Sequence, residues 1–89
     1  MQVTVYGPLR SATGEKAVDV SFAGGTAADA VAAFADAYPR ARSQLYTDDG
    51  DLRPSVRVMR DGERVDLEDS CPADADLALF PAMQGGRAR

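Results

Sequence analysis

The chain has 89 residues, of which 45% are hydrophobic and 27% are charged, a composition typical of a single globular domain. Fourteen acidic residues against ten basic ones give a net charge of −4, which argues against a nucleic-acid-binding protein. Histidine is absent and Cys71 is the single cysteine, which excludes histidine–cysteine zinc sites, Ser-His-Asp triads and Cys-His dyads. We expect a cytoplasmic protein without a membrane partner, because no apolar run approaches roughly 20 residues and the N-terminus lacks a secretory pattern.

The first half of the chain predicts two strands and one long helix. Alternating apolar residues predict strands over 3–7 and 17–22. A turn region at 11–15 separates them, so the pair forms an N-terminal hairpin. The helix is predicted over 27–38, where apolar residues recur at 3/4 spacing. This apolar stripe consists of Ala27, Ala30, Val31, Phe34, Ala37 and Tyr38.

Both ends of the predicted helix have recognisable signals. Thr26, followed three residues later by Asp29, resembles a capping box, and the Asp29 carboxylate complements the positive end of the helix. Pro39 ends the helix, because the residue before a proline is disfavoured in the α region. The segment 40–45 is expected to form a short helical turn.

The second half of the chain predicts three further strands. Residues 56–60 alternate as a strand, the Asp61-Gly62 pair predicts a tight hairpin turn, and 63–65 return as a short strand. The last strand is predicted over 77–80 and Pro81 ends it. The acidic loop 47–51 has the composition of a calcium loop without its ligand spacing, so we interpret it as a solvated turn and expect no bound metal.

This order of elements predicts an α+β protein of the β-grasp, or ubiquitin-like, type. A single long helix must cover one face of a mixed sheet of four or five strands to bury both apolar surfaces. Beyond Pro81, residues 82–89 show neither strand nor helix periodicity. We therefore expect a domain over 1–81 followed by a flexible C-terminal tail that contains Gly85-Gly86 and a three-residue extension.

These features together resemble the prokaryotic ubiquitin-like sulfur carriers and protein modifiers. That family (MoaD/ThiS-like) includes the small subunit of molybdopterin synthase, its cysteine-biosynthesis relatives and the small archaeal modifier proteins. The pattern is most similar to the archaeal modifiers, which agrees with the eleven aspartates among the fourteen acids. The matching segments are Gly25-Thr26, Tyr38-Pro39, Asp49-Gly50-Asp51-Leu52, Val58-Met59-Arg60-Asp61-Gly62, and Leu77-Ala78-Leu79-Phe80-Pro81 followed by Gly85-Gly86.

The resemblance implies a substrate of catalysis that supplies no catalytic side chain and binds no cofactor. A ubiquitin-activating-type enzyme, using ATP and Mg²⁺, would adenylate the carboxylate of Gly86, and Gly85 would permit its close approach. The product is either a thiocarboxylate, which delivers sulfur for molybdopterin biosynthesis, or an isopeptide bond to a target lysine. The implied partners are the activating enzyme, target proteins, and the large subunit of molybdopterin synthase. Phe80, Pro81 and Met83 would form part of the docking surface.

The C-terminal extension departs from the family pattern. Arg87, Ala88 and Arg89 follow Gly86, so Gly86 has no free carboxylate until they are removed. We favour a precursor that a protease cleaves between Gly86 and Arg87. The alternative is a non-covalent ubiquitin-like interaction module with a blocked tail.

Two single residues complete the set of candidates. Lys16 is the only lysine, so self-linked chains would form there or on the N-terminal amine. The competing interpretation is that this lysine has no function. Cys71 is a potential thiol acceptor, but we interpret it as a partly buried loop residue, and Asp69 and Asp74 would raise its pKa.

Overall fold

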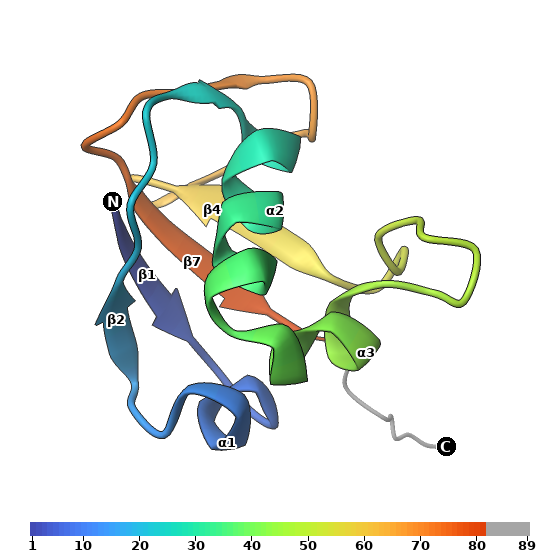
Figure 1. Ribbon diagram of the computed structural model, residues 1–89. Helices are drawn as coiled ribbons and strands as arrows, with labels where there is room; N and C mark the ends of the chain where they lie inside the picture. The colour runs from blue at the N-terminus through green and yellow to red at the C-terminus, as the bar shows by residue number, and fades with distance from the viewer. Residues whose placement is uncertain (82–89) are drawn as a thin grey trace.

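One long helix lies across one face of a five-stranded sheet (Figure 1). The structure is a computed structural model and describes residues 1–81. The strand order across the sheet is β2-β1-β7-β4-β5. The strands are β1 (Gln2–Val5), β2 (Ala17–Asp19), β4 (Arg57–Arg60), β5 (Glu63–Arg64) and β7 (Asp76–Phe80).

The sheet is mixed, as the β-grasp prediction requires. Strand β1 pairs antiparallel with β2 and parallel with β7, while β4 pairs antiparallel with both β7 and β5. The last strand is therefore central and has hydrogen-bonded neighbours on both sides. The Asp61-Gly62 turn joins β4 to β5, with φ of 53° at Asp61 and 87° at Gly62, and this confirms the predicted hairpin.

Helix α2 (Ala27–Ala37) begins at the predicted capping box. The Thr26 hydroxyl oxygen accepts from the backbone N–H of Asp29 at 3.1 Å, and the Asp29 carboxylate accepts from the backbone N–H of Thr26 at 3.0 Å. Two backbone donors at the helix start are thus satisfied reciprocally. Gly25 is required beside this cap, because a Cβ built there would lie 2.6 Å from the Asp29 Oδ2 atom.

The core lies between α2 and the inner face of the sheet. Phe34 at its centre is fully buried, and the centroid of its ring lies 5.5 Å from the centroid of the Tyr38 ring. Most of the predicted helix stripe is buried, but Ala37 is exposed and Ala35 is buried in its place. The sheet contributes Val3, Val5, Val18, Val58, Leu77 and Leu79 to this core.

The connection between β1 and β2 differs from the prediction. Residues Leu9–Thr13 form a short helix, α1, where the sequence predicted only a turn region. Leu9 is fully buried, and Gly14 ends α1 in the left-handed conformation at φ 77°, a common glycine cap. A buried anchor at one end and a glycine cap at the other stabilise a helix too short to show periodicity.

Other differences from the prediction are small. Strand β2 ends at Asp19 rather than 22, and a separate two-stranded sheet pairs β3 (Gly25–Thr26) with β6 (Ser70–Cys71). The predicted helical turn is present as the 3-10 helix η1 (Pro39–Ala41) and α3 (Arg42–Leu45). The acidic loop is closed by a 2.8 Å bond from the Thr47 N–H to the Asp51 carbonyl, as expected of a turn.

Candidate functional site

The candidate site lies at the C-terminal end of β7, next to the last of the described residues. Strand β7 ends at Phe80, which is half-buried, and Pro81 is buried. Both residues belong to the predicted docking surface. The other predicted site residues of this region, namely Met83, Gly85, Gly86 and Arg87, lie outside the described residues 1–81.

An aromatic stack forms the outer surface of this site. The rings of Tyr6 and Phe80 have centroids 4.2 Å apart and planes inclined by 8°. Tyr6 follows β1 and retains 38% exposure, and Phe80 is half-buried, so the stack is accessible to a partner. Aromatic residues of this kind are enriched at protein interfaces.

The pairing of Tyr6 with Phe80 is set by the register of the sheet. Thr4 of β1 pairs with Ala78 of β7 in the parallel register, which places residues 6 and 80 side by side on the outer face two residues further on. Period-two alternation alone puts both rings on outward-facing positions. Their adjacency depends on the β1–β7 register, which no local pattern reveals.

Lys16 is exposed and directly precedes β2, and its backbone carbonyl accepts from the Val5 N–H at 2.8 Å. The sheet therefore fixes its backbone while its side chain faces solvent. The other amine, at Met1, donates to the Val20 carbonyl at 3.0 Å and lies 3.6 Å from the Asp19 carboxylate. The Met1 amine is thus held by a hydrogen bond and an ion pair, whereas Lys16 is exposed to solvent.

Cys71 lies in strand β6 and is buried, with 1% exposure, rather than in a loop as predicted. Burial raises the pKa of its thiol, the Arg60 guanidinium opposes this shift, and the Asp61 carboxylate adds to it. The predicted direction is confirmed, but Asp69 and Asp74 are not its causes. A buried thiol held in its neutral form is a poor nucleophile.

Residues 1–81 show neither a metal-binding cluster nor a membrane-spanning helix. No group of three or more cysteine or acidic side chains in this part of the chain is arranged to hold a metal ion. None of the described helices combines the length and apolar character needed to cross a membrane.

Comparisons with known proteins match the chain almost end to end. The ThiS family model matches residues 3–86. Small archaeal modifier protein 1 of Haloferax volcanii is 34% identical over 97% of this chain and 100% of its own length. A crystal structure of that protein superposes with a TM-score of 0.81 at 33% identity, covering 96% of this chain and 97% of the other.

Two structures at lower identity support the fold alone. Small archaeal modifier protein 1 of Methanosarcina acetivorans has a TM-score of 0.77 at 19% identity, over 96% of this chain and 94% of the other. A chain of the BexX/CysO complex of Amycolatopsis orientalis has a TM-score of 0.74 at 24% identity, over 96% of this chain and 98% of the other.

Proposed function

The chain belongs to the ThiS family of small ubiquitin-like carrier proteins, which are not enzymes themselves, and we propose that its reactive group is the carboxylate of Gly86. The observation that supports this most directly is that the family match extends through residue 86. Arg87, Ala88 and Arg89 follow that residue. The proposal therefore includes a protease that cleaves the Gly86–Arg87 peptide bond and frees the carboxylate.

The chemistry begins with a carboxylate that is a poor acyl electrophile. An activating enzyme would use ATP and Mg²⁺ to join the Gly86 carboxylate to AMP, releasing pyrophosphate. A sulfur donor would then displace AMP to give a thiocarboxylate, or a target lysine amine would displace AMP, lose a proton and form an isopeptide bond. The glycine pair suits this chemistry because no Cβ obstructs the approach to the reacting carbonyl.

The docking part of the proposal rests on the end of β7. Phe80, half-buried against Tyr6, would be an anchor for the activating enzyme, and Met83 would extend that surface along the tail. Pro81 is itself buried, so its role would be to direct the tail away from the sheet rather than to contact a partner. The BexX/CysO complex shows that a chain of the same fold was crystallised with a protein partner.

We further propose Lys16 as the acceptor if the protein is linked to copies of itself. Lys16 is exposed, whereas acylation of the Met1 amine would disturb its hydrogen bond to Val20 and its ion pair with Asp19. Mapping the linkages by peptide mass spectrometry checks this. Chains that persist in a Lys16→Arg variant and are linked through Met1 would contradict it.

The experiment that tests the main proposal is an intact-mass measurement of the protein purified from its own cells. We expect a species ending at Gly86, and a replacement of one carboxylate oxygen by sulfur would identify the sulfur-carrier form. Lysine adducts on other proteins would identify the modifier form. Only protein ending at Arg89 would favour the non-covalent interaction module and overturn the carboxylate mechanism.

A matched pair of variants strengthens the test. In protein truncated after residue 86, Gly86→Ala is expected to abolish adenylation and every covalent product, because the new Cβ lies beside the reacting carbonyl. Ala73→Ser, at an exposed loop position, is expected to leave them unchanged. Unaltered adduct formation in the Gly86→Ala protein would remove the support for Gly86 as the reactive residue.

A further inference from the structure

Two arginines form a basic pair on the outer face of the sheet, close to the end of β7. Arg57 pairs with Phe80 across β4 and β7, and Arg64 pairs with Met59 across β5 and β4. Residues 57 and 59 share a face of β4, so the two arginines are diagonal neighbours. Both are exposed, and within residues 1–81 neither forms an ion pair or donates a side-chain hydrogen bond.

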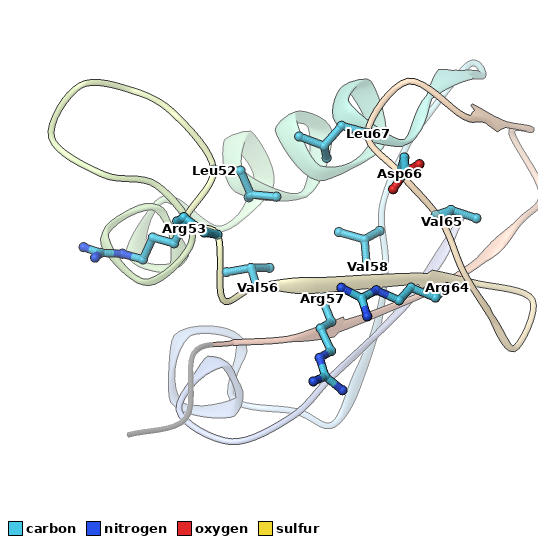
Figure 2. Close-up of a pocket in the computed structure, with 10 residues that line it drawn as sticks. Leu52, Arg53, Val56, Arg57, Val58, Arg64, Val65, Asp66 and Leu67 are labelled. Atoms are coloured by element: carbon cyan, nitrogen blue, oxygen red, sulfur yellow. The ribbon is translucent and has the colours of Figure 1, made fainter. Parts of the chain in front are cut away.

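The surface beside these arginines is hollowed on two sides. A groove of about 480 Å³ is lined by Pro54, Ser55, Arg57, Arg64, Phe80 and Pro81. A second groove, of about 200 Å³, shares Arg57 and Arg64 and continues to apolar residues that include Val58 and Leu67. Figure 2 shows the Arg57 side chain on the side of β4 opposite to Val58 and Leu67. The arginine pair therefore stands at the rim common to both grooves.

The charge of this corner is opposite to that of the protein around it. Residues 1–81 contain eight bases and all fourteen acids, a net charge of −6. The larger groove nevertheless has no acidic residue in its lining, and the smaller one has only Asp66. Two guanidinium groups without an ion-pair partner among residues 1–81 lie next to Phe80, so this corner offers positive charge and an apolar contact at the same place.

We propose that this corner, formed by Arg57, Arg64, Phe80 and Pro54, binds an extended acidic segment of a partner protein. A carboxylate of that segment fits the guanidinium groups, which bind carboxylates through paired N–H donors. An adjacent apolar side chain of the segment packs against Phe80 and Pro54. A nucleic acid fits less well, because its continuous phosphate charge would meet the acidic surface beyond these two residues.

The corner lies at the C-terminal end of β7. The groove includes Phe80 and Pro81, the last described residues, so a partner held there lies beside the point where residue 82 begins. The inference goes beyond the proposed function, because binding of an acidic segment does not require Gly86 to be free or activated.

The test uses the full-length protein labelled with ¹⁵N and two synthetic peptides. One peptide contains Asp and Glu interleaved with Leu, and the other replaces each acid by Lys. We expect saturable amide shifts with the acidic peptide only, centred on residues 57, 64 and 80, and weaker binding at higher salt. The Arg57→Gln/Arg64→Gln variant is expected to bind about tenfold more weakly, as the loss of two exposed charge pairs predicts.

A matched variant controls for net charge. Arg10→Gln/Arg40→Gln removes two other exposed arginines and is expected to change the affinity less than about twofold, because neither residue lines either groove and exposed charges outside the contact are screened. Equal weakening by the two double variants would overturn the proposal. So would the absence of saturable binding, shifts centred elsewhere, equal binding of the lysine peptide, or tighter binding of a single-stranded oligonucleotide at the same residues.

Discussion

The two faces of the sheet are built from the same strands but have different exposure. On the inner face Val3, Val5, Leu77 and Leu79 are each 0–1% exposed. On the outer face Thr4, Ala78 and Met59 are half-buried and Tyr6 is 38% exposed. Because side chains alternate along a strand, neighbouring residues serve opposite purposes: one stabilises the fold and the next is available to a partner.

Removing the central core residue should have the largest effect on folding. Phe34→Ala is expected to lower the free energy of unfolding by about 3–5 kcal/mol, because it deletes a fully buried ring and leaves a cavity. Denaturant unfolding followed by circular dichroism measures this. Ala32→Ser, exposed on the same helix, is the control and is expected to cost about 0.5 kcal/mol or less. Equal losses would contradict a core formed between α2 and the inner face of the sheet.

The aromatic stack on the outer face should contribute less. A double-mutant cycle of Tyr6→Ala and Phe80→Ala is expected to give a coupling energy of about 1 kcal/mol, the usual range for an aromatic pair. The Phe80→Ala protein should therefore remain folded while its proposed docking anchor is lost. A coupling energy near zero would indicate that the rings contact one another without mutual stabilisation.

The smallest expected effect is a pH dependence of the free energy of unfolding, caused by Cys71 in β6. The Cys71 thiol has its pKa raised from 9.0 by burial, so the unfolded chain loses this proton at lower pH than the folded one. The corresponding stability is complete below pH 9 and is lost as the pH rises above 9 through the folded pKa. The unfolding free energies of wild type and Cys71→Ala are compared at pH 8 and pH 10. This separates the effect of the thiol from that of the tyrosines, which are present in both proteins. If the difference in unfolding free energy between the two proteins were the same at both pH values, this prediction would be contradicted.

Much of the fold was predictable because its signals are local. The capping box at Thr26 and Asp29, Pro39 beyond the helix, the Asp61-Gly62 turn and the alternating strands each depend on residues a few positions apart. The order of these elements was sufficient for the β-grasp topology, which the comparison structures support.

The features that escaped prediction depend on distant contacts. Helix α1 depends on the burial of Leu9, and β6 exists because Cys71 and Ser70 pair with β3, some 45 residues earlier. The Tyr6–Phe80 stack and the Arg57–Arg64 pair require the sheet register. Ala37 was misplaced because the helix ends at that residue, where the periodic stripe no longer faces the sheet.

The central position of β7 has a mechanical consequence. A force applied beyond residue 81 enters the domain along β7, which is hydrogen-bonded to β1 on one side and β4 on the other. Because the force runs along the strand, the bonds across both ladders share the load together instead of opening one by one from an edge. Residue 82 thus follows directly on the central strand, and a force applied beyond residue 81 is resisted by the hydrogen bonds on both sides of β7.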